Sequence, residues 1–499
     1  MIKKQAQINT AERPPIIAVM GHIDHGKSTL LDYIRKSNVV EGEAGGITQH
    51  LSSYEVVHKV KSGPEKTITF LDTPGHAAFS AMRGRSAGVA DIIILIVSAE
   101  DGVQAQTKEA LKQIKEAKKP FVVAITKTDK PNANIERTKS SLIENEIYLE
   151  GMGGDISYVP ISSKTGEGID DLLDVLLLVA EVEELSGDAS KPAEGTVIES
   201  HLDSKKGTQA TLIITDGTLN KGEFIVVEDT FSPVRAIENS LGKQIASATF
   251  STPIQITGFN KVPRTGARFL AYSNKKEAEA TATAFSKTTA STKNTFEERK
   301  DMITVPIVIK SDVLGTLEAV EREVLNLSFE HAQIKILSKG VGNISENDIK
   351  TIRSADSPLV IGFHVKTGRG VEELAERSNI TIKVFDIIYK ITEWLEEEVP
   401  KRVPKELAQE IAGRASIIKI FSSTKNKYVA GAHLNEGEMI SGSEIKIYRR
   451  ENEVATGKIL ELQQKKEKVS RISQEVDFGI QLESKIEIAP GDELVCIGQ

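Results

Sequence analysis

Residues 21 to 28 constrain the fold of this chain more than any other segment. They read Gly-His-Ile-Asp-His-Gly-Lys-Ser and match G-x-x-x-x-G-K-[ST], a pattern that wraps a polyphosphate. The apolar residues 16 to 20 predict a buried strand before it, and residues 28 to 35 predict a helix after it. A loop in this position aims backbone N–H groups and the positive end of a helix at an anion. The segment therefore predicts a phosphate-binding loop in a parallel α/β domain.

The residue types in the loop each suit a phosphate. Gly21 and Gly26 lack a Cβ, so the backbone can bend closely around the ligand. The Lys27 ammonium is expected to bridge the β- and γ-phosphates, and the Ser28 hydroxyl to hold Mg²⁺. The predicted nucleotide contacts are Gly21, His22, Ile23, Asp24, His25, Gly26, Lys27, Ser28 and Thr29.

A second motif, Asp72-Thr73-Pro74-Gly75-His76, follows the β-branched run 67 to 71. This spacing puts Asp72 at the carboxyl end of a strand beside the phosphate loop, where an outer-shell Mg²⁺ ligand belongs. Gly75 can offer its N–H to a γ-phosphate without side-chain interference. Loss of that phosphate would release the segment that follows, so the motif predicts a nucleotide switch.

Two further motifs predict which base is bound. Thr126-Lys127-Thr128-Asp129 follows the strand predicted at 121 to 125, and Ser162-Ser163-Lys164 follows the one at 158 to 161. A carboxylate at Asp129 accepts from the ring N–H and the exocyclic amine of guanine, whereas adenine presents the opposite pattern. The expected ligand is GTP rather than ATP, with base-side contacts from Thr126, Lys127, Asp129, Ser162, Ser163 and Lys164.

Six motifs together match one family. They are residues 21 to 29, 43 to 50 (Glu-Ala-Gly-Gly-Ile-Thr-Gln-His), 72 to 76, 341 to 348, 361 to 365 and 387 to 389. Over nearly its whole length the chain resembles the translational GTPases, specifically bacterial translation initiation factor 2. The resemblance implies a ribosome-stimulated GTPase that uses GTP/GDP and Mg²⁺, holds formylmethionyl initiator tRNA on the small ribosomal subunit and promotes joining of the large one. It also implies other initiation factors as partners and a monomeric, cytoplasmic protein.

The resemblance assigns further roles. Thr48 matches the switch threonine that meets Mg²⁺ and the γ-phosphate, and His76 matches the catalytic histidine that positions the attacking water. Ile23 and Ile47 match the apolar pair that flanks this histidine, and Asp24 matches the acid of the phosphate loop. A lone histidine after glycine is more often structural, but the motif around His76 favours the role in hydrolysis.

Composition narrows the class of protein. The single cysteine, Cys496, excludes a disulfide framework and a thiolate metal cluster. No apolar run reaches the roughly 18 residues that a membrane span needs, so no membrane partner is expected. The net charge of -8 argues against broad nonspecific binding to nucleic acid, so RNA contacts should be local. The long N-terminal region of many bacterial relatives is expected to be missing.

Polar stretches divide the chain into a multidomain α/β and β architecture. Residues 186 to 192 read as a linker by composition, and apolar residues at helical spacing run from 387 until Pro400. The predicted parts are a tail (1 to 12), a P-loop GTPase domain (13 to 185), a β-barrel (193 to 274), a helical connector (275 to 302), an αβα sandwich (303 to 386), a long connecting helix (387 to 404) and a second β-barrel (405 to 499).

The αβα sandwich has no phosphate loop of its own. Strands are predicted near 305 to 309, 334 to 337, 359 to 365 and 381 to 385, and residues 340 to 342 form only a weak Gly-x-Gly. A packing and docking module is therefore favoured over a second nucleotide site. Trp394 is expected to pack rather than to stack on RNA.

The last barrel is the least acidic part, with a net charge of +1 over residues 401 to 499. Turns are predicted at 435 to 437, 441 to 443 and 490 to 492. Candidate contacts to tRNA phosphates are Arg449, Arg450, Lys465, Lys466, Lys468 and Arg471, although such loops are often only solvated.

Four positions depart from the family pattern. Relatives carry Ala-Gly-Cys where this chain has Ala430-Gly431-Ala432, and Glu-Cys-Gly-Ile where it has residues 477 to 480. In the family these positions line the formylmethionine pocket, so Asp477, Phe478 and Gly479 are candidate tRNA contacts, and Phe478 narrows the pocket or stacks on the ligand. Thr126 replaces the usual asparagine, for which threonine can partly substitute.

Two functions of different class stay open. One is an active GTPase that carries initiator tRNA, and the other is a GTP-gated ribosome-binding factor that no longer recognises formylmethionine. An elongation-type carrier is disfavoured, because such carriers place two barrels directly after the GTPase domain, whereas residues 300 to 399 interpose an α/β unit and a helix here.

Overall fold

The computed structural model describes residues 10–36, 48–61, 63–203, 205–288, 302–403, 411–424, 426–450, 452–465, 467–473 and 475–497. The chain divides into two compact units, Met1–Glu398 and Val399–Gln499. The predicted fold class, a multidomain α/β and β protein, is confirmed. No helix among these described residues is long and apolar enough to cross a membrane.

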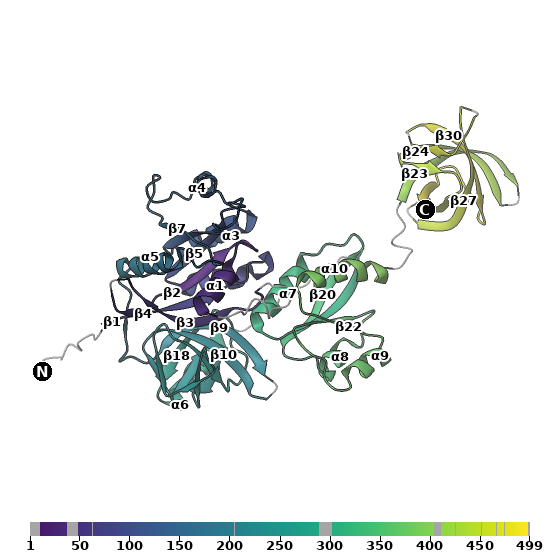
Figure 1. Ribbon diagram of the computed structural model, residues 1–499. Helices are drawn as coiled ribbons and strands as arrows, with labels where there is room; N and C mark the ends of the chain where they lie inside the picture. Colours follow the sequence, from purple (N-terminus) through teal and green to yellow (C-terminus); the bar gives the residue numbers. More distant parts are fainter. Residues whose placement is uncertain are drawn as a thin grey trace. The chain divides into compact units, whose positions relative to one another are not determined.

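A six-stranded sheet organises the first domain (Figure 1). Its order is β3 (Ser52–Lys59), β4 (Glu65–Asp72), β2 (Ile16–Gly21), β5 (Ile92–Ser98), β6 (Phe121–Thr126) and β7 (Tyr158–Pro160). All neighbours pair in parallel except β3 with β4. The carboxyl ends of parallel strands meet at one edge, so the motifs after β2, β4, β6 and β7 share that edge.

Helices cover both faces of this sheet. The helices are α1 (Lys27–Arg35), α2 (Ser80–Val89) after the 3₁₀ turn η3 (Ala77–Phe79), α3 (Ala105–Ala117), α4 (Ile135–Glu144) and α5 (Ile169–Val182). Along β2, Ile17 and Val19 share a core with α1 and α5, whereas Ile16, Ala18 and Met20 share another with α2, α3 and α4. Alternation of strand side chains builds the two cores.

The predicted tail and linker contain an unexpected pair of strands. β1 (Thr10–Glu12) pairs antiparallel with β8 (Ser186–Asp188). A Cβ on Gly187 would lie 2.7 Å from the Phe250 ring, so glycine is needed for the close approach to the first barrel. The composition of residues 186 to 192 predicted a linker because composition contains no information about strand partners that are distant in the sequence.

The first barrel consists of short antiparallel strands. They are β9 (Glu194–Asp203), β10 (Gly207–Asp216), β11 (Thr218–Asn220), β12 (Phe224–Val227), β13 (Thr230–Pro233), β14 (Ile237–Asn239), β15 (Gln244–Ile245), β16 (Ser247–Thr249), β17 (Pro253–Thr257) and β18 (Arg268–Tyr272). The following helix α6 (Lys275–Thr288) packs on this barrel through Ala278 and Ala282 against Val226. The rest of the predicted connector, residues 289 to 301, lies outside the described residues.

A four-stranded parallel sheet forms the next unit. Its order is β20 (Ala332–Val341), β19 (Ile303–Ser311), β21 (Leu359–Phe363) and β22 (Thr381–Phe385), and each overlaps a predicted strand. Its helices are α7 (Leu314–Asn326), α8 (Glu346–Ile352), α9 (Val371–Arg377) and α10 (Tyr389–Glu398), followed by the 3₁₀ turn η4 (Pro400–Arg402). The Trp394 ring packs against Phe385 with centroids 5.6 Å apart. The predicted connecting helix thus ends at Glu398, and residues 404 to 410 are not among those described.

The second compact unit is a closed barrel. Its strands are β23 (Ile411–Thr424), β24 (Lys427–Gly437), β25 (Met439–Ile440), β26 (Glu444–Arg449), β27 (Asn452–Gln464), β28 (Glu467–Val469), β29 (Arg471–Ile472), β30 (Asp477–Ser484) and β31 (Glu493–Ile497). The pairing of β26 with β27 closes a ring of six strands. The turn predicted at 435 to 437 is wrong in part, since Glu436 pairs with Arg414 within the sheet and only Gly437 has a positive φ, of 71°.

Candidate nucleotide-binding site

The phosphate loop depends on two glycines. Gly21 ends β2 with a φ of 153°, and a Cβ there would lie 2.5 Å from the Ile96 carbonyl oxygen. Gly26 caps α1 in the left-handed region with a φ of 89°. Asp24 is also left-handed, with a φ of 62°. Side chains with a Cβ rarely adopt such backbone, so the loop shape requires glycine at its ends.

Lys27 lies buried across this loop. Its Nζ donates to the carbonyl oxygens of Gly21 at 3.1 Å and His22 at 2.6 Å. Burial lowers the pKa of Lys27 to about 8, an effect that the Asp72 carboxylate partly offsets. Two neutral carbonyls hold the ammonium group, and a charge-assisted hydrogen bond to a phosphate would be stronger than either of these bonds.

The residues predicted to hold Mg²⁺ come together from separate segments. Ser28 Oγ at the start of α1 lies 2.8 Å from Thr48 Oγ1, across 20 positions of sequence. Asp72 ends β4 and is nearly buried, with 8% exposure. Hydroxyl and carboxylate oxygens are the hard donors that Mg²⁺ prefers, so this set fits the ion. Ile47, the predicted partner of Ile23, lies outside the described residues.

The switch loop closes against the phosphate loop at Gly75. A Cβ there would lie 2.6 Å from Lys27 Nζ and 3.2 Å from Ile23 Cγ1. Any larger residue would therefore displace the lysine that contacts phosphate. The motif brings Gly75 and Lys27 together, as a shared phosphate requires.

His76 is oriented by its neighbours on both sides. Its Nδ1 accepts from the Ala78 N–H at 3.0 Å, which leaves the proton of the neutral ring on Nε2. The ring packs edge-on against Tyr389 of α10, with centroids 4.4 Å apart. Burial, and then the charge of Arg83, lowers the pKa of His76. The imidazole is therefore neutral near pH 7.

Arg83 supports the switch loop and was not anticipated from sequence. It is 1% exposed, and its Nη1 donates to the carbonyls of Pro74 and Gly75, each at 3.1 Å, and to that of His76. Its Nη2 pairs with Glu109 of α3 at 2.7 Å. Because three of its partners are backbone carbonyls, no pattern of side chains in the sequence could reveal them.

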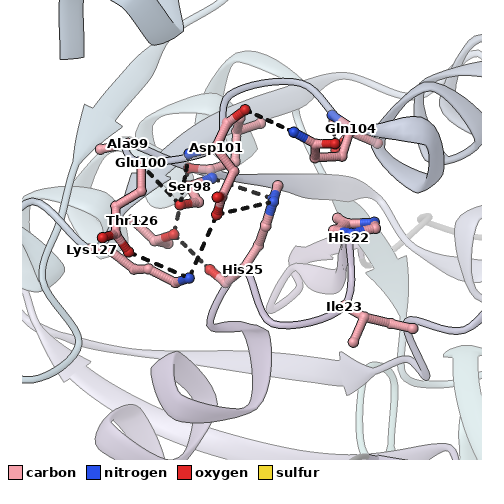
Figure 2. A network of polar contacts seen from close by, with 12 residues as sticks. His22, Ile23, His25, Ser98, Ala99, Glu100, Asp101, Gln104, Thr126 and Lys127 are labelled. Atoms are coloured by element: carbon pink, nitrogen blue, oxygen red, sulfur yellow. Dashed lines mark hydrogen bonds and ion pairs between the residues drawn. The ribbon is translucent and has the colours of Figure 1, made fainter. Parts of the chain in front are cut away.

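Figure 2 shows how the loop after β6 meets the phosphate loop. Thr126 Oγ1 donates to the His25 carbonyl at 2.6 Å, so the threonine ties the two loops together. His25 Nδ1 accepts from the Ser98 N–H at 3.3 Å, and burial lowers the pKa of His25 to about 4. Lys127 Nζ lies 3.7 Å from both Glu100 and Asp101.

The two base-side motifs also meet. Ser162 Oγ donates to Asp129 Oδ1 at 2.7 Å and lowers the pKa of that carboxyl group. Ser163 and Lys164 continue the same loop, half-buried and exposed respectively. Asp129 itself is exposed, so its carboxylate is ionised and accessible to a base.

Three of the six charged candidates for tRNA contacts form ion pairs within the barrel. Arg449 makes a bidentate ion pair with Asp492, at 2.7 Å and 2.8 Å, and donates to the Glu487 carbonyl. Arg450 follows it with a φ of 50°. Lys468 pairs with Glu461 at 2.5 Å and Arg471 with Glu438 at 3.2 Å. Lys466 lies outside the described residues. The tRNA contact of Arg449 stays a prediction, and a phosphate would have to compete with Asp492 for this guanidinium.

Phe478 faces the interior of the barrel rather than a pocket. It is 5% exposed and belongs to the barrel core, as does Ala432 directly opposite on β24. Asp477 points outward and pairs with His433 at 2.7 Å. A strand alternates its side chains between two faces, so Gly431 and Gly479, which pair directly, lie on the outer face.

Side chains of neighbouring strands lie close to these two glycines on the outer face. A Cβ on Gly431 would lie 3.2 Å from the Phe421 ring, and one on Gly479 would lie 3.4 Å from Gln463 Cβ. Phe421 is 66% exposed. Sequence reasoning missed Phe421, although an aromatic residue at an outward position of a strand was the available signal.

Three family models match consecutive parts of the chain. The one described as the elongation factor Tu GTP binding domain matches residues 12–181, the one described as elongation factor G domain 2 matches 192–272, and the one described as translation-initiation factor 2 matches 280–396. The first match contains the phosphate loop and the base-side motifs.

Relatives match almost the whole chain. A protein of Bacillus licheniformis named "Translation initiation factor IF-2" is 41% identical over 492 residues, which cover 96% of this chain and 68% of the relative. A protein of the same name from Bacillus cereus is 40% identical over 496 residues, covering 97% and 71%. The crystal structure of GDP-bound aIF5B from Aeropyrum pernix is 26% identical, with a TM-score of 0.48, and covers 97% of this chain and 92% of its own.

Proposed function

Because the chain belongs to the translation initiation factor 2 family and is a GTP-binding GTPase, we propose that it holds formylmethionyl initiator tRNA on the small ribosomal subunit and promotes subunit joining. GTP and water yield GDP and phosphate in its first domain. The observation that carries the proposal is the convergence of the phosphate, switch and base motifs at one edge of the sheet. Ribosome stimulation, both subunits and other initiation factors as partners, a monomeric state and a cytoplasmic location belong to the same proposal.

The phosphates of GTP replace the carbonyls that hold Lys27. The loop N–H groups and the Lys27 ammonium neutralise charge on the β- and γ-phosphates, while the Gly75 N–H meets the γ-phosphate. Ser28 and Thr48 would hold Mg²⁺, with Asp72 as an outer-shell ligand, and the bound ion would neutralise further phosphate charge. Support comes from the 2.8 Å separation of the Ser28 and Thr48 hydroxyls and the burial of Asp72.

His76 positions the attacking water. Its neutral ring carries the proton on Nε2 while Nδ1 is fixed by Ala78, so the ring can orient water without abstracting a proton in the ground state. In this arrangement the ring packs on Tyr389. Productive positioning therefore requires either the ring or Tyr389 to move, and docking on the ribosome supplies that movement in the proposed cycle.

Guanine is read by Asp129. Its carboxylate, oriented by Ser162, accepts from the ring N–H and the exocyclic amine of the base. Thr126 holds the base loop against the phosphate loop through the His25 carbonyl. The same contact lets occupancy of the base site stabilise the phosphate loop.

The outer face of the last barrel beside Phe421 is the proposed seat for the aminoacylated end of the tRNA. An exposed aromatic ring can pack on a thioether or stack on a base. The engagement of Arg449 by Asp492 favours a rival function, a GTP-gated ribosome-binding factor without formylmethionine recognition.

A binding comparison on the full chain separates these functions. Formylated initiator tRNA, its unformylated form and an elongator tRNA are titrated in the presence of GTP and Mg²⁺. We expect the formylated form to bind at least about tenfold more tightly than the other two, a difference of about 1.4 kcal/mol. Phe421→Ala should abolish that preference, whereas Ile486→Ala, a change at an exposed apolar residue of another segment, should not. Equal affinity for all three tRNAs would support the rival function.

A further inference from the structure

Three potential metal ligands meet outside the nucleotide site. His50 follows Thr48 closely before β3, Asp312 lies between β19 and α7, and His364 follows β21. His50 Nε2 lies 2.7 Å from Asp312 Oδ2 and 3.4 Å from His364 Nδ1, and the latter lies 3.6 Å from Asp312 Oδ2. This is the one group of three or more such ligands found among the described residues.

The separations suit a tetrahedral ion. Zn²⁺ bound at about 2.0–2.2 Å to two imidazoles and a carboxylate, with tetrahedral angles, separates its ligand atoms by about 3.3–3.5 Å. Two of the three observed separations, 3.4 Å and 3.6 Å, are close to that value. The third, 2.7 Å, is a hydrogen bond between His50 and Asp312 and must open by about 0.7 Å.

Neighbouring groups already orient the ligand atoms. His364 Nε2 donates to the Asp386 carbonyl at 2.8 Å, so in the neutral ring Nδ1 carries the lone pair that faces the cluster. Asp312 Oδ1 accepts from the Val313 N–H and the Thr316 hydroxyl, each at 2.8 Å, which leaves Oδ2 for the ion. Such outer hydrogen bonds are the usual support of histidine and carboxylate ligands.

We infer that His50, Asp312 and His364 form a binding site for Zn²⁺, with water as the fourth ligand. Binding breaks the hydrogen bond between His50 and Asp312, and the neutral His50 ring exchanges its Nε2 proton for one on Nδ1 through solvent, so that Nε2 presents a lone pair to the ion. Partial exposure of the side chains, 38% for His50, 26% for Asp312 and 16% for His364, leaves a path for the ion and its water. Nitrogen ligands favour Zn²⁺ over Mg²⁺, so the site is distinct in chemistry from Ser28, Thr48 and Asp72.

Bound Zn²⁺ would fasten the segment after Thr48 to the αβα sandwich. That segment already contacts the sandwich through Gln49, whose side chain donates to the Asp386 carbonyl at 2.9 Å and accepts from the Ile388 N–H at 3.3 Å. The ion would add a coordinated link between the same two elements. The inference does not depend on the tRNA function proposed above.

The chain contains a matched control for the third ligand, a histidine–aspartate pair in the last barrel. His433 and Asp477 lie at the same 2.7 Å separation, yet no third ligand joins them among the described residues. If a histidine–aspartate pair were enough for tight binding, both places would bind Zn²⁺ equally. His364→Asn is the informative variant at the proposed site, because His364 has a φ of 53° and asparagine tolerates left-handed backbone.

The test is a titration of ZnCl₂ into the full chain. Bound metal is first stripped with a chelator, and the protein is then saturated with Mg²⁺ and GDP. A chromophoric chelator that competes for Zn²⁺ reports the affinity of the site. We expect a wild-type site that His364→Asn and Asp312→Asn each weaken at least about tenfold, while His433→Ala leaves it unchanged. Equal binding by wild type and His364→Asn, or loss of the site in His433→Ala, would overturn the inference. CoCl₂ reports the coordination geometry in the wild-type protein, since tetrahedral Co²⁺ absorbs visible light strongly and octahedral Co²⁺ only weakly.

Discussion

Replacement of Arg83 by leucine tests whether one buried side chain holds the switch loop in place. The guanidinium donates to the carbonyls of Pro74, Gly75 and His76 and pairs with Glu109. Arg83→Leu keeps an apolar stem and removes all of these donors. We expect the loop that carries Gly75 and His76 to open far more often while the sheet and its cores stay intact.

The free-energy cost of Arg83→Leu follows from the hydrogen bonds and the ion pair that the variant loses. A hydrogen bond to a charged group contributes about 1.5 to 3 kcal/mol, and removal of one partner from a buried ion pair costs about 3 to 5 kcal/mol. Glu109 is 31% exposed and can regain water, so the lower end applies. A loss of about 3 kcal/mol corresponds to roughly a hundredfold increase in the open population of the loop.

Hydrogen–deuterium exchange of the amides of Ala78 and Phe79 measures this opening, because they bond to His76 Nδ1 and to the His76 carbonyl. The matched control is Arg85→Leu, on the same helix, which removes a partly exposed pair with Glu318. We expect about hundredfold faster exchange in Arg83→Leu and little change in Arg85→Leu. Equal exchange in the two variants would refute the role assigned to Arg83.

Three further predictions concern the base, a buried acid and the last barrel. Asp129→Asn should shift preference from guanine to xanthine nucleotides by more than about tenfold in a competition titration, because an amide presents a donor where the guanine amine needs an acceptor. Unchanged GTP affinity would remove Asp129 from the base site. Burial raises the pKa of Glu199 from 4.5 to about 7, so the folded protein keeps a proton that the unfolded chain releases in that window. Stability should then fall as pH rises from 4.5 to 7, by up to about 3 kcal/mol, and Glu199→Gln should flatten this slope in urea unfolding. Phe478→Ala should lower the free energy of unfolding of the barrel by about 3 to 5 kcal/mol. Phe421→Ala, at an exposed position, should change it by less than about 0.5 kcal/mol and affect ligand binding instead. A larger loss of stability in Phe421→Ala than in Phe478→Ala would contradict the assignment of Phe478 to the interior and Phe421 to the outer face.

The sequence predicted best what local chemistry dictates. Gly21, Lys27 and Ser28 stand at spacings that a phosphate imposes, so a short pattern was enough to place them where a strand ends and the next helix begins. The spacing of Ile391 and Leu395 likewise predicted the buried face of α10. Such features depend on neighbours along the chain, which a single sequence contains in full.

What the sequence missed depends on partners that are distant in the chain. The facing of Phe478 follows from the register of β24 against β30, and one residue of slip would have turned it outward. Arg83 acts on backbone carbonyls, which every residue carries. The cluster of His50, Asp312 and His364 joins segments 262 and 314 positions apart, so no motif contains it.

Ribosome-stimulated single-turnover hydrolysis, measured together with GTP affinity, tests the central claim most directly. For His76→Ala the account predicts unchanged GTP binding and hydrolysis slower by at least about a hundredfold, because the change removes water positioning and no ground-state phosphate contact. For Lys27→Ala it predicts loss of binding itself, since this ammonium group neutralises the phosphates. Equal loss of affinity in both variants, or full hydrolysis by His76→Ala, would contradict the account.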